Sequence, residues 1–223
     1  MNRRLEPELM DDAAQAKAYA EADFSESNTL FMRLLAALNP GDLAGAEALD
    51  LGCGPADVSI RFLKIHPLAR CEALDGAPAM LELAHAALAR LPGVATRCQL
   101  RCERLPSAQL PSGHYDVILS NSLLHHLPDP QVLWQTIQQV AKPGALVVVM
   151  DLLRPASAGW AEALVATYAE GMPEVLRSDF RNSLFAAFEP AEVVAQLAAA
   201  GLTTLEVGVV SDRHLAITGR LPR

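Results

Sequence analysis

The chain has 223 residues, of which 51% are hydrophobic and 20% are charged, and its formal net charge is −8. This length suits one sizeable core and is short for two domains, while the acidic balance disfavours a nucleic-acid partner, whose phosphates bind mainly Lys and Arg. No stretch reaches the roughly 18 apolar residues of a membrane span, and the basic start at Arg3 and Arg4 lacks the apolar run of a signal peptide. We therefore expect one domain over residues 1–223, located in the cytoplasm.

The first 42 residues predict a helical cap, followed by a regular alternation of elements. Residues 11–38 are rich in alanine and carry leucines at helical spacing, and the Pro-Gly pair in 39–42 ends this helix. Strands alternating with helices indicate βαβ units and a mostly parallel sheet. The expected strands are Glu47–Leu51, Arg70–Leu74, Thr96–Cys102, Tyr115–Ser120 and Ala145–Leu152, and the expected helices lie near 55–65, 77–90 and 130–141.

The C-terminal third departs from this rhythm. Residues 189–200 predict a helix that begins with a Glu-Pro pair and ends at Gly201. Two apolar runs follow, Leu202–Val210 and Arg213–Gly219, and the link between them is so short that they form an antiparallel hairpin. The segment 154–188 has mixed character, and with residues 1–42 it is expected to form a lid over the ends of the strands.

Four cysteines are present, and none belongs to a CxxC pair: Cys53, Cys71, Cys98 and Cys102. The spacing of the last two allows a metal or thiol site, but we favour a short strand and its end, because cysteine is often simply buried. We recognise no set of metal ligands in the sequence.

The strongest motif is a glycine-rich turn after the first predicted strand. Gly52 and Gly54 lack a Cβ, so the backbone there can approach a ligand closely. The third glycine of the dinucleotide fingerprint is missing, which counts against a nicotinamide cofactor. Asp50, just before the turn, suits a cationic amino acid better than a pyrophosphate.

A second signal is Asp75, at the end of the next predicted strand and 21 residues beyond Gly54. An acidic side chain at this place can accept both ribose hydroxyls of an adenosine. The alternative is an aspartate that caps a helix or a turn.

Four segments in this order resemble the class I S-adenosylmethionine-dependent methyltransferases, in the broad group that includes the quinone-ring enzymes. The resemblance implies a Rossmann-like three-layer α/β sandwich with a seven-stranded, mostly parallel sheet in the order 3-2-1-4-5-7-6 and an antiparallel terminal hairpin. It also implies transfer of a methyl group from S-adenosylmethionine to a small-molecule acceptor by in-line displacement. The matching segments are LDLGCG (49–54), ALDGAPAMLELA (73–84), YDVILSNSLLHHLPDP (115–130) and KPGALVVVMD (142–151).

The resemblance implies a cofactor role for residues at the ends of the first four strands. The glycine turn would pass under the methionine part of the cofactor, with Asp50 near its amino group. Asp75 would hold the ribose, and Gly76 and Met80 would flank the adenine. The acid that normally ends the third strand is displaced or absent here, so backbone groups are expected to serve instead. The expected cofactor-binding residues are Tyr19, Asp50, Gly52, Cys53, Gly54, Asp75, Gly76, Met80, Arg101, Cys102 and Asn121.

The resemblance places His125 and His126 over the methyl position. Either is a candidate general base, since an imidazole titrates near neutrality; the alternative is that both are loop residues packing against the cofactor. Asn121 is not followed by Pro-Pro and an aromatic residue, so the pattern of the amino-methylating DNA and RNA enzymes is absent.

The methyl acceptor is expected to bind between the N-terminal helix and the 154–188 segment. Arginines there either bind a carboxylate or phosphate of the acceptor or are exposed surface residues. The expected acceptor residues are Phe24, Asn28, Arg154, Tyr168, Arg177, Arg181 and Asn182.

Three other functions remain open at this point. One is a protein or peptide methyltransferase with the same cofactor site. Another is a non-catalytic protein that binds S-adenosylmethionine or S-adenosylhomocysteine, for which the displaced third-strand acid is mild support. The third is a nicotinamide-dependent oxidoreductase, which the glycine spacing and the terminal hairpin disfavour. The sequence leaves the oligomeric state open.

Overall fold

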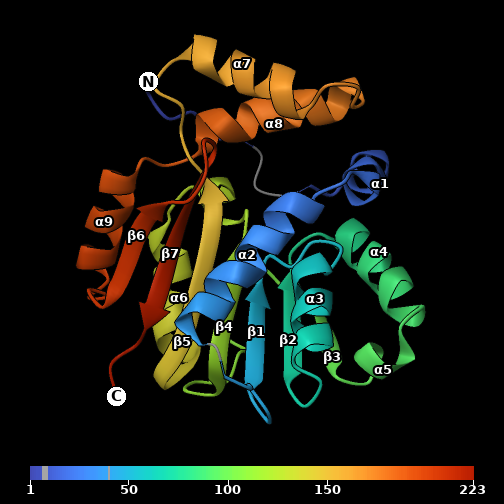
Figure 1. Ribbon diagram of the computed structural model, residues 1–223, viewed down its shortest axis with the longest axis vertical. Coiled ribbons are helices and arrows are strands. Elements are labelled where there is room, and N and C mark those ends of the chain that lie inside the picture. The colour runs from blue at the N-terminus through green and yellow to red at the C-terminus, as the bar shows by residue number, and fades with distance from the viewer. Residues whose placement is uncertain (7–9, 40) are drawn as a thin grey trace.

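The computed structural model describes residues 1–6, 10–39 and 41–223, so Pro40 of the predicted helix stop lies outside the described residues (Figure 1). Within them, a seven-stranded sheet has the order β3-β2-β1-β4-β5-β7-β6. This order and its Rossmann-like arrangement are as the sequence predicts. The strands are β1 (Glu47–Leu51), β2 (Arg70–Asp75), β3 (Cys98–Cys102), β4 (Tyr115–Asn121), β5 (Ala141–Leu152), β6 (Leu205–Val209) and β7 (His214–Arg220).

The strand directions place several chain ends at one edge of the sheet. Strands β1 to β5 pair in parallel, whereas β7 runs antiparallel to both β5 and β6. Because the carboxyl ends of parallel strands meet at the same edge, the turns after β1, β2 and β4 gather there. The predicted hairpin of β6 and β7 is confirmed.

Helices cover both faces of the sheet (Figure 1). On β5, Val147 packs into the core that contains α6 and α9, and the next residue, Val148, packs into the core that contains α2 and α3. A strand covered on both faces needs apolar residues at successive positions, which explains its unbroken valine run. The longer helices are α1 (Ala13–Glu21), α2 (Ser25–Leu38), α3 (Asp57–Ile65), α4 (Pro78–Ala89), α6 (Gln131–Val140), α7 (Ala158–Tyr168), α8 (Glu174–Ala186) and α9 (Pro190–Ala199).

The single N-terminal helix predicted over 11–38 is wrong. The chain leaves the helical conformation at Ala22, and helix α2 begins at Ser25. The Ser25 amide donates a hydrogen bond to the Asp23 side chain at 2.9 Å. Alanines continue up to Ala22 and leucines at helical spacing follow in α2, so the helical pattern alone does not reveal the break. A short helix, α5 (Pro92–Ala95), precedes β3, and this strand begins at Cys98 instead of at the expected Thr96.

Helices α7 and α8 lie above the carboxyl edge of the sheet, and we refer to these two helices as the lid (Figure 1). Helix α1 lies beside α4. Residues 1–6, which we call the N-terminal strap, dock against the end of α8, where the Arg4 amide donates to the Phe185 carbonyl at 2.9 Å.

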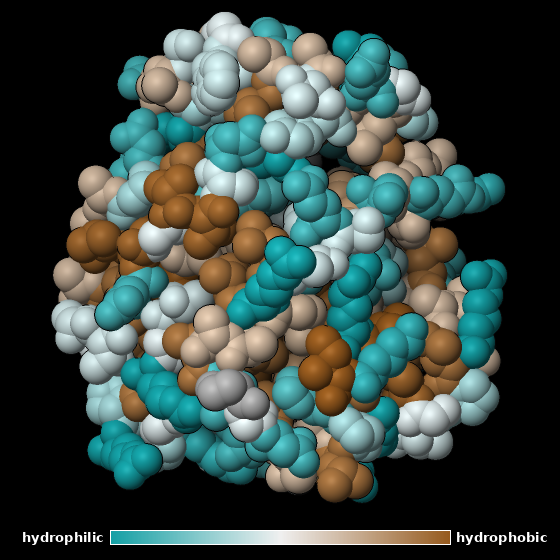
Figure 2. All heavy atoms as spheres, in the orientation of Figure 1, coloured by the Kyte–Doolittle hydropathy of each residue, from teal (hydrophilic) through white to brown (hydrophobic). Residues whose placement is uncertain are grey.

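The surface mixes hydrophilic and hydrophobic residues on the face shown in Figure 2, with a hydrophobic group over the β6–β7 hairpin. Val209 contributes to the exposed apolar surface of β6. No helix among the described residues has both the length and the apolar character to cross a bilayer.

Candidate functional site

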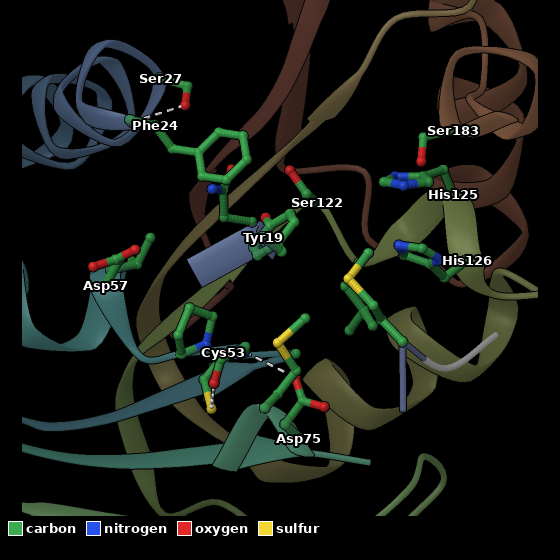
Figure 3. A pocket seen from close by; sticks show the side chains of 18 of the residues that line it. Tyr19, Phe24, Ser27, Cys53, Asp57, Asp75, Ser122, His125, His126 and Ser183 are labelled. Atoms are coloured by element: carbon green, nitrogen blue, oxygen red, sulfur yellow. Dashed lines mark hydrogen bonds between the residues drawn. The ribbon is translucent and has the colours of Figure 1, made fainter. Parts of the chain in front are cut away.

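A cavity of about 340 Å³ lies between the carboxyl edge of the sheet and the lid (Figure 3). It is lined by most of the residues that the sequence singled out, although they come from widely separated segments. Those that line it are Tyr19, Phe24, Asn28, Asp50, Gly52, Cys53, Gly54, Asp75, Gly76, Met80, Asn121, His125, His126 and Tyr168.

The glycine turn after β1 is shaped for contact with a ligand. Gly54 has a φ of +52°, and a Cβ added there would meet no protein atom within 4 Å, so the space beside it is open. Gly52 has a φ of +72°, and a Cβ there would come within 2.9 Å of the Leu123 side chain. Packing against the protein therefore requires a glycine at position 52. At position 54 the missing Cβ instead leaves room for a molecule in the cavity.

Asp75 shows one of the two roles that the sequence left as alternatives, that of an aspartate that caps turns, and it also lines the cavity. Its Oδ2 accepts a hydrogen bond from the Gly54 amide and its Oδ1 from the Ala77 amide, each at 2.8 Å. The carboxylate therefore fixes the turns after β1 and β2. Each oxygen also has a second lone pair, available to a hydroxyl in the cavity. Burial raises the pKa of Asp75, although the hydrogen bonds from the backbone amides act in the opposite direction.

Asp50 is a buried carboxyl at the end of β1. It is 1% exposed, and Ser59 donates a hydrogen bond to it at 2.5 Å. Burial raises the pKa of Asp50 to about 7, and the nearby Asp75 carboxylate adds to the effect. A positive group bound beside these two acids would stabilise their ionised forms.

The end of β3 corrects one expectation. Arg101 and Cys102 lie outside the cavity lining, which instead includes the next residue, Glu103. The Arg101 guanidinium pairs with Glu72 and, at 3.4 Å, with Glu103. An acidic residue is therefore present at the cavity after β3. It is Glu103, which directly follows the two residues whose backbone groups were expected to contact the cofactor.

His125 is held by carboxylates on both sides of its ring. Its Nδ1 lies 2.5 Å from Asp151 Oδ1 at the end of β5, and its backbone amide donates to Asp151 Oδ2 at 3.2 Å. Its Nε2 lies 3.3 Å from Oε1 of Glu6, in the N-terminal strap. Burial disfavours the charged ring, but Asp151 and Glu6 outweigh it and raise the pKa of His125.

Asp151 shows the reciprocal effect. Burial works against its charged form, but the His125 ring outweighs burial and lowers the pKa of Asp151. An imidazole oriented by a buried carboxylate is the usual arrangement of a histidine general base. In Figure 3, His125 and His126 lie together on one side of the cavity, opposite Asp57 and the Tyr19–Phe24 pair.

The arginines of the lid correct a further expectation. Arg154 pairs with Glu189 and Glu192, and Arg181 makes two hydrogen bonds to Glu162. Together with Arg177 and Asn182, they lie outside the cavity lining. The cavity lining therefore does not bring these residues to the acceptor region, and an acceptor role for them stays a prediction.

Arg213, in the turn between β6 and β7, lines the cavity but was not among the predicted site residues, and the same holds for Arg104. Its guanidinium lies 3.4 Å from the centre of the Tyr168 ring and 3.2 Å from Glu26. Tyr168 in turn donates a hydrogen bond to Asp212 at 2.6 Å. The cluster joins the lid, helix α2 and the hairpin, and no local sequence pattern links these distant residues.

The cavity lining as a whole is more apolar than polar. Near the histidines, Leu152 of β5 and the lid residues Met172, Leu176 and Phe180 supply apolar side chains, and the lid adds the polar side chains of Tyr168, Asp179 and Ser183. An acceptor bound under the lid would therefore contact mainly apolar groups, with the two histidines at one end.

Three side chains bring possible metal ligands within 4.8 Å of one another, namely Glu6, His125 and His126. This set could not be recognised in the sequence, because the glutamate and the histidines are 119 and 120 positions apart. The Glu6 carboxylate pairs with both imidazoles, and Asp151 holds the other side of His125. We therefore treat the group as a network of carboxylates and imidazoles.

Comparisons with known proteins find similar sequences. A model of the methyltransferase-domain family matches residues 49–147. A ubiquinone biosynthesis O-methyltransferase of Xanthomonas oryzae is 30% identical over 172 residues; the match covers 74% of this chain, which spans 66% of that relative's length.

Solved structures share the fold at low sequence identity. An S-adenosylmethionine-dependent methyltransferase from Aquifex aeolicus superposes with a TM-score of 0.68 at 18% identity, over 94% of this chain and 98% of the other. The plantazolicin methyltransferase BpumL, crystallised with a substrate analogue and SAH, gives a TM-score of 0.69 at 14% identity, over 95% and 90% of the two chains.

Proposed function

Since the chain belongs to the class I S-adenosylmethionine-dependent methyltransferases, we propose that it methylates an oxygen atom of a small, mostly apolar acceptor. The observation that carries this proposal is the buried His125–Asp151 pair at the cavity wall. A neutral hydroxyl is a poor nucleophile, so it needs a base that an amine or a thiolate can do without. The relatives named as O-methyltransferases support the same choice of atom.

The residues present fit S-adenosylmethionine. The open space beside Gly54 admits a ligand close to the backbone, and Asp50 and Asp75 offer negative charge where a cationic molecule with ribose hydroxyls would lie. When bound, the cofactor supplies a methyl group on a positively charged sulfur, which reacts with the acceptor oxygen as the carbon–sulfur bond breaks. We assign the amino group to the neighbourhood of Asp50 and the ribose to Asp75.

The histidines would handle the proton of the acceptor. Asp151 fixes the orientation of the His125 ring, and His125 and His126 together line the cavity wall. The hydroxyl proton would pass, as the oxygen attacks, to a ring that is neutral before the reaction, because only a neutral imidazole has a nitrogen lone pair to accept it. Holding the reacting atoms in line in a water-poor cavity contributes up to about 7–11 kcal/mol to lowering such a barrier.

The lid would select the acceptor and exclude water. Helices α7 and α8 carry the apolar wall, and α1 and α2 close the opposite side. We propose that residues 1–42 and 154–188 of a single domain serve this purpose. A location in the cytoplasm and the absence of a nucleic-acid partner stay predictions from composition.

Methyl transfer is tested with cofactor carrying a labelled methyl group. The purified protein is incubated with a panel of small aromatic hydroxyl compounds, matched amines and thiols, and a fractionated metabolite extract, and the products are analysed by mass spectrometry. We expect a labelled methyl ether. Absence of any labelled product, or labelling of nitrogen or sulfur alone, contradicts the proposal.

The base is tested by His125→Gln, which we expect to lower kcat by about 10²- to 10⁴-fold with little change in cofactor affinity. His85→Gln is the matched control, because His85 is exposed on α4 and does not line the cavity. A His125→Gln enzyme with the wild-type rate would remove this residue from the mechanism.

A further inference from the structure

The N-terminal strap is anchored to the same turn that carries the histidines. The Arg3 guanidinium donates hydrogen bonds to the carbonyls of His125, at 2.9 Å, and Leu127, at 3.0 Å. It also donates to the Ala186 carbonyl at 2.6 Å and lies 3.9 Å from the centre of the Phe188 ring. One side chain thus ties the strap to the end of the lid and to the turn Leu124–His126.

This anchor brings Glu6 between the two imidazoles. Its Oε1 lies 3.3 Å from His125 Nε2 and 3.3 Å from His126 Nδ1, and its Oε2 accepts a hydrogen bond from Ser183 at 3.2 Å. The side chain is only 7% exposed. A buried carboxylate is costly unless it is paired, and the groups that pair with it here are the two histidines.

The result is a row of alternating acids and imidazoles: Asp151, His125, Glu6 and His126. The centres of the two rings lie 4.2 Å apart, so the rings repel each other whenever both are charged, and the Glu6 carboxylate between them offsets this repulsion. Glu6 does not itself line the cavity, whereas both histidines do. Its influence on an acceptor must therefore pass through the rings.

We propose that Glu6 is a positioning residue of the methyl-transfer site, which joins His125 to His126 and holds both rings at the cavity wall. This inference rests on the proposed function of the histidines. It makes the first six residues, which no motif marked, part of the catalytic apparatus. Arg3 is the residue that keeps them in place.

The charges around His125 set the direction of the expected effect. The groups that face it are Asp151 on β5, Glu6 and Arg3 of the strap, and His126 on its own turn, while Asp179 on α8 acts on Glu6. Glu6 favours the protonated ring. Removing its charge should therefore let the His125 proton leave at lower pH.

The first test uses no substrate. We expect Glu6→Gln to lower the proton affinity of His125 about tenfold or more, measured by NMR titration of the ring carbon resonance that disappears in His125→Gln. Glu6→Ala removes the same charge and gives a second route to the change if Glu6→Gln does not fold, whereas Arg3→Ala also removes a positive charge that lowers the pKa of His125. Glu21→Gln is the control, since it removes one negative charge from an exposed site on α1.

The second test follows kcat/KM against pH with the acceptor found above. A base acts only when deprotonated, so the acid limb of the Glu6→Gln profile should move to lower pH, with KM for the cofactor unchanged. A merely structural role would lower the rate at every pH and leave the limb in place.

The inference is overturned if the His125 titration in Glu6→Gln matches that of the wild type, or if Glu21→Gln shifts it equally. If no acceptor is methylated at all, the proposed function fails, while the NMR titration still decides whether Glu6 couples to His125.

Discussion

Asp75 accepts hydrogen bonds from two backbone amides and also borders the cavity, so one side chain shapes the turn and offers lone pairs to a ligand. Asp50 and Asp151 occupy comparable positions, each buried at the end of a strand. A carboxylate buried without a charged partner is unfavourable. Asp151 has such a partner in His125, whereas Asp50 has the Ser59 hydroxyl and a pKa near 7, which suits a site that awaits a cation.

We expect Asp75→Ala to weaken binding of S-adenosylmethionine by about 10- to 150-fold, because hydrogen bonds to a charged group contribute about 1.5–3 kcal/mol. Calorimetric titration measures this loss directly. Glu82→Ala, on the exposed side of the neighbouring helix α4, is the control. Equal affinity in Asp75→Ala and the wild type would refute the assignment of the ribose to Asp75.

At this scale the sequence predicts the residues that belong to a local motif. Gly54 and Asp75 could be assigned because each follows a predicted strand at a characteristic spacing. Glu6 and Arg213 could not, because their place at the site depends on tertiary contacts with distant segments. The pairing of Arg181 with Glu162, outside the cavity lining, could not be predicted either, since nothing in the sequence links these two residues.

Among the elements, the turn between β1 and α3 brings the glycines, the acids and the histidine-bearing turn together. Gly52 packs against Leu123, so the position of this turn also sets that of the segment leading to His125. Gly54 instead faces open space. The two glycines therefore contribute differently, one to packing and the other to access.

Alanine at each position separates these contributions. Both variants carry a cost of about 1–2 kcal/mol for a left-handed residue with a Cβ, and Gly52→Ala adds a collision with Leu123. We expect Gly52→Ala to be clearly less stable in urea unfolding than Gly54→Ala. We also expect Gly54→Ala to stay folded and yet bind the cofactor poorly. Wild-type affinity in Gly54→Ala would show that the cofactor does not approach this backbone.

The order of strands and helices was predictable because each segment carries its own periodicity. The unbroken apolar run of β5 indicated a strand covered on both faces, as the structure shows. The break between α1 and α2 was not predicted, since it involves only a few residues, with extended backbone at Ala22 and a hydrogen bond from the Ser25 amide to Asp23, between two segments of helical pattern. Element bounds that depend on such local capping escape a pattern-based analysis.

On the scale of the whole molecule, the turns at the carboxyl edge of the sheet line one side of the cavity and the lid lines the other. The turns after β1 and β2 form the part of the cavity assigned to the cofactor, and α7, α8 and the two histidines form the part assigned to the acceptor. This division explains why the cofactor could be inferred from sequence motifs, whereas the shape of the acceptor pocket emerges only from the assembled lid.

The central claim is that the turn at 52–54 and the carboxylate of Asp75 together bind S-adenosylmethionine. Isothermal titration calorimetry of the purified protein with S-adenosylmethionine and, separately, with NAD tests it most directly. We predict binding of one S-adenosylmethionine per chain and no binding heat with NAD. Binding of NAD without binding of S-adenosylmethionine would contradict the account.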